Sequence, residues 1–387
     1  MISRKGKVAG WGVAAMLLSL APCMAATNFY VRGDGLGLDT YAGTNWATAF
    51  RTIQKALASV PFNTQTVIRV QATGAGEAGD YDVAQRVDPY HADYANPYVM
   101  DIVLEGGYTN IGVAPARGGV SVICDLDGSV SEAGLEINKG LWPLTVRVSG
   151  FQIRDVTHGI KLTQTSGADY SPVCLTLNDT DIAAFNTGVW IEYTQSYGSH
   201  GGAQLTATNV NIAAGQGGSG DGVYIKGAWA GTCIAASGTD ARTGLPRVSS
   251  ITSAGGGGLY FVDTATTSPR ADTAAFSSLV VHGCASNGIC MDSLSVSPAQ
   301  ATLDHCTIAD NGGDALRLIS RTAPSWAAIT NSIFANNGGH GVSLESTNSV
   351  FTCSEAYSDF YNDDVLVSGS VKALHATDAA GDPQFLA

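Results

Sequence analysis

The sequence predicts an all-β protein with the fold of a right-handed, single-stranded parallel β-helix, a solenoid closed at its N-terminus by a short capping helix. Three observations predict this fold. Apolar residues recur at intervals of 26 to 29 residues, they alternate with polar residues within each copy, and Gly or Asn separates the short apolar runs. Alternation is typical of strands, and Gly and Asn are typical of turns. Such a unit buries its inner face only when copies stack head to tail.

The repeat is read from matched positions. Gly159–Leu162 reappears 29 residues later as Gly188–Ile191 and again, after an insertion, as Gly222–Ile225. Late copies are shorter, because the apolar pattern from Ala301 to Leu318 recurs 26 residues later from Ala327 to Leu344. A leucine-rich repeat would need a Leu-x-x-Leu-x-Leu framework, and a β-sandwich would show hairpin turns without a fixed long period. The pattern therefore favours the β-helix.

Residues 1–26 resemble a signal peptide. Basic residues come first, an apolar run follows from Val13 to Leu20, and small residues precede a cleavage position after Ala25 or Ala26. The run is too short to span a bilayer. Cys23 also allows a lipoprotein signal, although Pro22 stands where such signals have a small residue. We therefore expect a secreted protein, whether extracellular, on the cell surface or periplasmic, without membrane insertion.

The mature chain is expected to divide into three parts. Residues 27–143 hold the cap and the first irregular coils, 144–370 the regular coils, and 371–387 a C-terminal tail that could be truncated. Residues 45–60 have helical spacing of their apolar side chains and end at Pro61, so this segment is the predicted capping helix. Such a cap covers strand edges that would otherwise invite aggregation.

Composition restricts the partners. The net charge of −13 argues against nucleic acid or an anionic membrane surface, because both bind basic faces. Seven cysteines follow residue 26, without a CxxC or a His-spaced zinc pattern. We interpret them mainly as small apolar core residues, with room for one loop disulfide, and expect no metal site. Nothing in the sequence indicates an oligomeric state.

Several segments resemble exported bacterial β-helix proteins of the pectin-lyase-like superfamily. The resemblance lies in Phe29–Asp34, in Gly43–Leu57, in Leu104–Tyr108 and in the closing Asp382–Phe385. It implies the same fold and an extracellular polysaccharide as partner. It implies no single reaction, because the superfamily includes lyases, hydrolases and surface adhesins.

One segment resembles a catalytic element of polygalacturonases. Gly339-His340-Gly341 is similar to their Gly-His-Gly element, and Asn178–Asp181 and Asp221 could take the roles of their acidic residues. However, Asp221 lies some four coils before His340, or about 19 Å at the spacing of stacked strands, whereas inverting hydrolysis needs carboxyls roughly 6.5–9.5 Å apart. We therefore interpret His340 as a turn residue, and His158, His282 and His305 as turn or surface histidines.

Strand alternation also predicts a binding surface. If the apolar residues of the Gly-x-x-x strands point inward, their neighbours point outward and stack on successive coils. Long loops that follow these strands would add further groups. Aromatic and charged residues on one outer face are typical of a groove that holds a sugar chain. The predicted substrate-binding residues are Lys161, Trp190, Tyr224 and Tyr260 on strands, with Trp229 and Arg242 on loops.

Two functions remain open. The first is polysaccharide binding, or an extracellular interaction role, through this aromatic groove. The second is a polysaccharide-degrading enzyme in the same groove, either a uronate-polymer lyase or a glycoside hydrolase. In that case Lys226 or Arg317 is the candidate base, and Glu192 and Asp292 are the candidate carboxylates. Lys226 with Glu192 is the more plausible local pair. We expect no cofactor, except Ca²⁺ if the protein is a lyase.

Overall fold

The computed structural model describes the chain between residues 26 and 372, with internal gaps. The predicted signal peptide (1–26) and tail (371–387) lie almost wholly outside the described residues. Among the helices that are described, none is long and apolar enough to cross a membrane. The described residues are 26–74, 79–87, 99–111, 114–128, 132–139, 143–165, 172–194, 202–217, 220–227, 231–239, 246–263, 272–293, 298–320, 323, 325–346, 359–361, 365–367 and 370–372.

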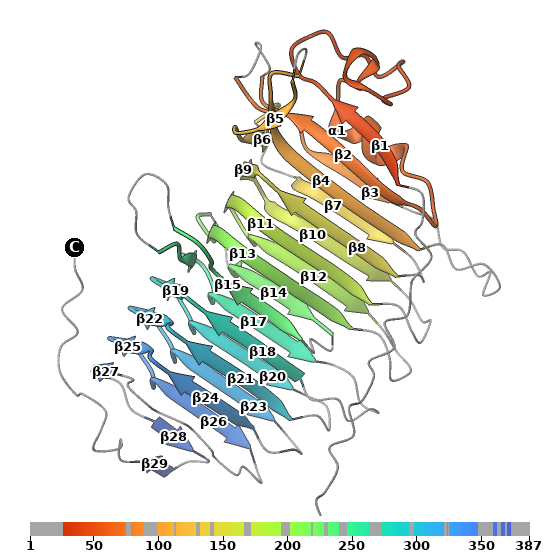
Figure 1. Ribbon diagram of the computed structural model, residues 1–387. Helices are drawn as coiled ribbons and strands as arrows, with labels where there is room; N and C mark the ends of the chain where they lie inside the picture. Colours follow the sequence, from red (N-terminus) through yellow and green to blue (C-terminus); the bar gives the residue numbers. More distant parts are fainter. Residues whose placement is uncertain are drawn as a thin grey trace, which may run out of the picture.

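The described strands form two sheets, which we call sheet A and sheet B. Sheet B forms one side of the molecule (Figure 1). Away from its two ends, each of its strands pairs with the strand one coil earlier and the strand one coil later, and in its described part only the last pairing, of β28 with β29, is antiparallel. In sheet order, its described strands are β3 (Ala84–Val87), β7 (Ala133–Lys139), β10 (His158–Thr165), β12 (Val189–Thr194), β14 (Val223–Lys226), β17 (Leu259–Asp263), β20 (Ile289–Ser293), β23 (Leu316–Ser320), β26 (Val342–Ser346), β28 (Val365–Val367) and β29 (Ser370–Lys372).

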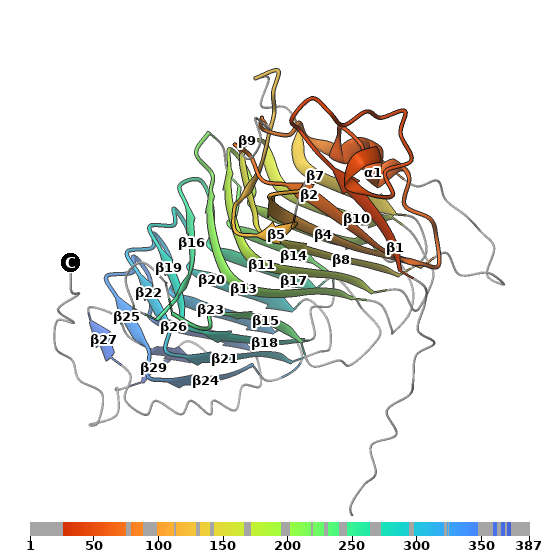
Figure 2. The ribbon, with the colours of Figure 1, turned by 45° about the horizontal axis from the view of Figure 1, so that its top comes forward.

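Sheet A supplies the remaining strands of each coil and bends through a corner, which is seen in Figure 2 with the top of the molecule tilted forward. Its first side holds β1 (Thr27–Val31), β2 (Gln65–Gln71), β4 (Met100–Thr109), β8 (Leu144–Ser149), β15 (Thr232–Ala235), β18 (Asp272–Ser277), β21 (Ala299–Asp304) and β24 (Trp326–Thr330), with β5 (Ala116–Arg117) antiparallel to β4. Its second side holds β6 (Ser121–Cys124), β9 (Phe151–Val156), β16 (Ser249–Ser253), β19 (Leu279–His282), β22 (Thr307–Ala309), β25 (Ile333–Ala335) and β27 (Asp359–Tyr361). The long strands β11 (Val173–Ala184) and β13 (Ala203–Ala214) run through both sides.

The strand pairings confirm the predicted register. Leu162 pairs with Ile191 across β10 and β12, and both strands run in the same direction. In the late copies Leu318 pairs with Leu344, as the 26-residue spacing predicts. Connections between parallel strands are right-handed in nearly all proteins, and the fold is the right-handed parallel β-helix that the sequence predicts.

The core is a set of apolar columns inside the coils. Along β8, buried and half-buried residues alternate strictly, as the two-residue period of a strand requires. Aromatic residues continue some columns, and the rings of Phe334 and Phe360 stack with centroids 4.7 Å apart. Each coil therefore buries its inner face only against its neighbours.

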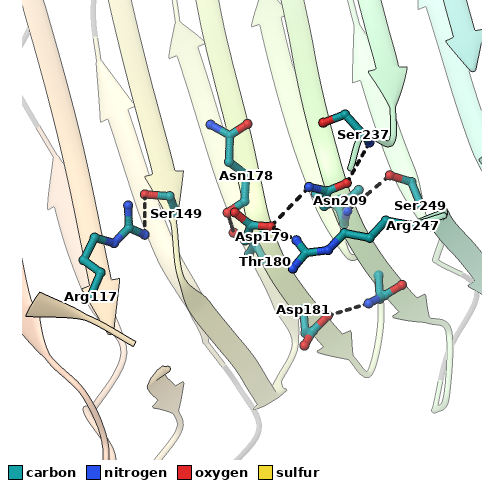
Figure 3. A network of polar contacts seen from close by, with 12 residues as sticks. Arg117, Ser149, Asn178, Asp179, Thr180, Asp181, Asn209, Ser237, Arg247 and Ser249 are labelled. Carbon is teal, nitrogen blue, oxygen red and sulfur yellow. Dashed lines mark hydrogen bonds and ion pairs between the residues drawn. The ribbon is translucent and has the colours of Figure 1, made fainter. Parts of the chain in front are cut away.

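The corner between the two sides of sheet A is built from left-handed residues. Figure 3 shows the polar contacts there. Asp179 accepts a hydrogen bond from Asn209 at 3.2 Å and forms an ion pair with Arg247 at 2.6 Å, while Asn211 donates to Asp181 at 2.7 Å. Asn, Asp and other short polar residues tolerate a positive φ better than bulky ones. The corner residues with a φ between 46° and 56° are Asp179, Asn209, Ser278, His305 and Asn331.

A second corner, where the chain enters sheet B, explains the repeated glycine. A Cβ atom on Gly188 would lie 2.3 Å from Ile212 Cγ2 and 2.6 Å from the carbonyl oxygen of Gly222 on the next coil. Glycine is needed at this corner because a side chain would have no space. Backbone conformation is not the reason, because none of the glycines at this corner has a positive φ. We call Gly134, Gly159, Gly188, Gly222, Gly258 and Gly288 the glycine stack.

Two buried asparagines join the late coils. Asn311 donates from Nδ2 to Asn337 Oδ1 at 2.8 Å, and Asn311 Oδ1 accepts from the Cys284 backbone N–H at 3.1 Å. Only 2 % of Asn311 and 7 % of Asn337 is exposed. Buried polar groups are stable only when hydrogen-bonded. The ladder therefore fixes the register of neighbouring coils.

Replacement of Asn311 by alanine should destabilise the late coils. The Cys284 N–H would lose the side-chain oxygen that accepts its hydrogen bond, and Asn337 Oδ1 would lose one of its donors. A buried group left unsatisfied costs roughly 1–3 kcal/mol. We expect a lower Tm in thermal unfolding followed by circular dichroism. Ser286→Ala, at an exposed neighbouring turn, is the control and should leave Tm unchanged. Equal Tm values for the two variants would show that the ladder does not stabilise the fold.

The N-terminal cap is shorter than predicted. The segment expected as one helix over residues 45–60 contains a 3-10 turn, η1 (Trp46–Thr48), and a separate helix, α1 (Ile53–Ala58). The interruption has a physical reason. Phe50 is extended between them, because its backbone N–H bonds to the Tyr30 carbonyl and it bridges to Val31. The face of α1 that covers the first coils consists of Ile53, Ala56 and Leu57.

Candidate functional site

A row of aromatic side chains crosses the outer face of sheet B. Strand register aligns Trp190 with Tyr224 and Tyr224 with Tyr260. The ring centroids lie 4.8 Å apart in the first pair and 5.9 Å apart in the second, with interplanar angles of 50° and 52°. His158 extends the row, its ring 5.3 Å from that of Trp190. All four side chains are half-buried. We call them the aromatic row.

The repeat places an ion pair beside this row. Glu192 and Lys226 are register partners on β12 and β14. Lys226 Nζ donates to Glu192 Oε1 at 2.6 Å, and Trp190 Nε1 donates to Glu192 Oε2 at 3.3 Å. Glu192 therefore orients both an aromatic residue and a cation. This is the local pair that the sequence suggested.

Two further ion pairs lie on the same face. Lys161 Nζ is 2.9 Å from Glu136 Oε1, its register partner on β7. Arg317, on β23, contacts Glu345 at 2.9 Å and Asp314 at 3.9 Å. The structure thus places Lys161 at the start of the aromatic row and Arg317 two strands beyond Tyr260.

A pocket of about 350 Å³ adjoins the start of the aromatic row. His158 Nδ1 is buried there and has no hydrogen-bond partner among the described residues. Sequence reasoning missed this pocket, because much of its lining lies in the irregular first coils and His158, which lies on β10, was expected to be a turn or surface histidine. The 25-residue spacing of Glu136 and Lys161, one coil apart, was the available signal. We call it the terminal pocket, and its lining includes Gln54, Gln85, Glu132, Glu136, His158 and Lys161.

Burial and nearby acids set the electrostatics of the row. The pKa of His158 is lowered, first by burial and then by Lys161. Burial, with Glu192 and Asp221 nearby, raises the pKa of Tyr224. Burial also raises the pKa of Tyr260, with smaller contributions from Cys290 and Asp292. The row therefore carries a neutral imidazole at neutral pH and lies in a negative environment.

Asp221 sits in the turn before β14. Its Oδ1 accepts a hydrogen bond from the Gly257 N–H at 2.7 Å, and burial raises the pKa of its carboxyl. Later coils repeat the contact with other residues. Asn287 Oδ1 accepts from the Asp314 N–H at 2.8 Å. An uncharged side-chain acceptor can therefore make the same contact in this turn.

Asp221→Asn should raise the Tm at neutral pH. A raised pKa means that the folded state binds the proton more tightly than the unfolded state. The contribution of Asp221 to stability therefore falls as the pH rises from the ordinary carboxyl pKa of 3.8 through the folded-state pKa, and it stays unfavourable at pH 7. Asn keeps the acceptor and removes the charge. The Tm values of variant and wild type should converge below pH 3.8, and a variant that is less stable at pH 7 would contradict this account.

The remaining predicted site residues either lie far from one another or fall outside the described residues. Glu192 and Asp292 lie in the same outward row, but three strand steps separate them. Trp229 and Arg242 lie outside the described residues, as do most of the long loops predicted to flank the groove. The terminal pocket begins at Lys161, the first residue of the predicted groove, and extends from there toward the earlier coils.

The structure gives the polygalacturonase-like residues structural roles. The backbone N–H of His340 donates to Asp314 Oδ1 at 2.7 Å, so His340 continues the turn contacts of Asp221 and Asn287. Asp179 and Asp181 lie at the sheet A corner (Figure 3), away from sheet B. The interpretation of His340 as a turn residue is confirmed.

The described cysteines are free thiols. Burial raises the pKa of Cys290 to about 12 and those of Cys284 and Cys306 to about 11, which makes them unreactive. Cys353 lies outside the described residues. Within the part of the chain that the structure describes, no group of three His, Cys, Asp or Glu side chains is arranged to hold a metal ion.

Comparisons with known proteins find likeness in structure only. No family model matches the chain, and no curated protein sequence matches it. Among solved structures, the pectate lyase Pel9A is similar over 91% of this chain and 83% of its own, with 13% identity and a TM-score of 0.43. The A-module of the Azotobacter vinelandii mannuronan C-5 epimerase AlgE4 is similar over 84% of this chain and 100% of its own, with 12% identity and a TM-score of 0.34. Likeness at these identities says nothing of activity.

Proposed function

We propose that the protein is a secreted polysaccharide-binding protein that holds a glycan along the outer face of sheet B. The observation that carries the proposal is the aromatic row, in which Trp190, Tyr224 and Tyr260 follow one another on successive strands. Half-buried aromatic side chains offer apolar surface with little entropy to lose on binding. The spacing of the strands, about 4.8 Å, sets a repeating surface that suits a polymer better than a compact ligand.

Polar groups beside the row support the same function. Glu192 is held by Trp190 and Lys226, so its geometry is fixed before a ligand binds. Charged acceptors that are already oriented make strong hydrogen bonds with hydroxyl groups. The terminal pocket offers a concave end to an otherwise open surface. A sugar chain along the row would meet both features.

The geometry favours binding over cleavage. Three strand steps separate Glu192 from Asp292, or about 14 Å, whereas glycoside hydrolysis places its carboxyls about 5–9.5 Å apart. Lys226 Nζ already donates to Glu192 Oε1 at 2.6 Å, so each of these two side chains is engaged by the other. The spacing therefore argues against Glu192 and Asp292 acting together on one bond.

A binding and cleavage screen tests the proposal. Purified protein is run by affinity electrophoresis in gels that contain single polysaccharides, and the same polymers are assayed for new reducing ends and for unsaturated ends, with Ca²⁺ and with chelator. We expect retardation by at least one polymer without product. Product formation that disappears in Lys226→Ala would replace the proposal with catalysis, and retardation by none of the polymers would overturn it.

A further inference from the structure

We infer that the glycan is an uncharged polysaccharide and not a polyuronate, because Lys161, Lys226 and Arg317, on the described outer face of sheet B, are already paired with the protein's own carboxylates. This inference rests on the proposed function and narrows it to a substrate class. It concerns the surface defined by the aromatic row and the terminal pocket.

Three ion pairs carry the inference. Lys161 contacts Glu136 at 2.9 Å, Lys226 contacts Glu192 at 2.6 Å, and Arg317 contacts Glu345 at 2.9 Å. Each pair joins register partners or near neighbours on adjacent strands, so the fold itself brings the charges together. Uronate recognition needs cations that can receive a carboxylate. Here each of these cations has one.

A uronate would have to displace a carboxylate that is fixed beside its cation. A group held in place by the same fold acts at an effective concentration of about millimolar or higher. If the uronate displaced the glutamate, the two carboxylates would lie within a few ångströms of each other. Like charges at that distance repel each other strongly. Binding of a polyuronate along this surface would repeat this conflict at each pair.

Further acids strengthen the effect near the rings. Asp221 and Asp292 both contribute negative charge around Tyr260, and Glu192 and Asp221 do so around Tyr224. The chain as a whole carries a net charge of −13. The surface therefore repels a polyanion at long range as well as at contact.

The same groups suit hydroxyl-rich, uncharged sugars. Carboxylates accept hydrogen bonds from hydroxyl groups without a change of charge. In the terminal pocket, the carboxylates of Glu132 and Glu136 lie with the side-chain amide of Gln85. These groups offer several acceptors within one cavity. A neutral sugar at the end of the chain would satisfy them, whereas a uronate would add a charge of the same sign.

The test compares neutral and acidic polymers in parallel. Affinity electrophoresis with a β-glucan, a xylan and a mannan is set against polygalacturonate and alginate at two ionic strengths. We expect retardation by a neutral polymer that is insensitive to salt, and affinity for both polyuronates at least about tenfold lower. Stronger or equal binding of a polyuronate would overturn the inference while leaving the proposed function in place. Binding of neither class would overturn the proposed function itself.

Charge-neutralising variants test the cause. Glu192→Gln removes the charge that pairs with Lys226. Glu345→Gln, on a different coil, removes the closer of the two carboxylates beside Arg317, so failure of one variant to fold leaves the other. Each should raise the affinity for polygalacturonate by about tenfold or more, in a salt-dependent manner. Asp179→Asn is the matched control, because it releases Arg247 at the sheet A corner, and it should produce no gain. Gains equal to that of the control would show that overall charge, and not these pairs, excludes polyuronates.

Discussion

The Trp190→Ala variant should bind the glycan about 30-fold more weakly than the wild type. Trp190 lies between His158 and Tyr224 in the aromatic row and holds Glu192 through its indole N–H. Truncation of a central aromatic residue in a binding surface typically costs about 2 kcal/mol or more, which is about 30-fold in Kd. The substitution removes the largest ring of the row and leaves Glu192 with one partner fewer. Isothermal titration with the polymer identified by the screen measures the change.

Trp326 provides a matched control for this prediction. It is also a half-buried tryptophan on an outward strand position, but it lies on β24 in sheet A. Trp326→Ala should keep wild-type affinity, because the glycan is expected on sheet B. If the two variants lost affinity equally, the effect of Trp190 would be one of general stability. If Trp326→Ala alone lost affinity, the binding surface would lie on sheet A.

Gly222→Ala should lower the stability of the protein by about 3 kcal/mol. The added Cβ would lie 2.4 Å from Ile251 Cγ2 and 2.5 Å from the carbonyl oxygen of Gly258. Overpacking of a close-packed interior costs about 1–3 kcal/mol, and more where the backbone must shift. Here the obstacle includes a backbone oxygen that accepts from the Val223 N–H. Thermal unfolding should show a decrease of several degrees in Tm.

Gly118 is the control for the glycine stack. A Cβ atom added there would have no neighbouring atom within 4 Å, and its φ is not positive, so Gly118→Ala should leave Tm nearly unchanged. The Gly222 variant should also bind glycan less well, since the corner sets the position of β14, which carries Tyr224 and Lys226. A Gly222→Ala protein as stable as the wild type would mean that the coil relaxes easily at this corner.

The periodicity of the sequence determines most of the fold. Alternating apolar residues at a fixed spacing allow one stacking register, and the pairing of Leu162 with Ile191 follows directly. The repeated Gly of Gly159, Gly188 and Gly222 has its explanation only in three dimensions, because the atoms that exclude a side chain come from the next coil. The local sequence pattern thus predicts which residues stack on one another, whereas contacts between coils explain why glycine is required at these positions.

Irregular segments are harder to predict, since no repeat constrains them. The helical spacing of residues 45–60 is real, yet Phe50 pairs with Val31 and interrupts the helix. The terminal pocket depends on Glu132 and Glu136 in the first coils, where the copies are poorly matched. In the cap, strand pairing with Val31 overrides the local preference for helix. In the terminal pocket, no well-matched repeat shows which residues lie next to each other.

The candidate site was predictable to the extent that it follows the register. Trp190, Tyr224 and Tyr260 are neighbours because Val189, Val223 and Leu259 are paired one position earlier. Their ring tilts and the bond from Trp190 to Glu192 depend on rotamers, which a pattern does not specify. The roles assigned to Lys226, Arg317 and Asp292 in catalysis remain predictions, as do those of Trp229 and Arg242.

The constant 26-residue spacing of the late copies means that gain or loss of one copy would change the length of the β-helix by one coil. Leu303 pairs with its equivalent, Ile329, on the next coil. Loss or duplication of one 26-residue unit, residues 304–329, would therefore shorten or lengthen the rod by one layer and keep the pairing register of the remaining coils. The rings of the aromatic row lie on earlier layers and would keep their places. In such an architecture the reach of the molecule and the chemistry of its ligand surface can change independently of each other.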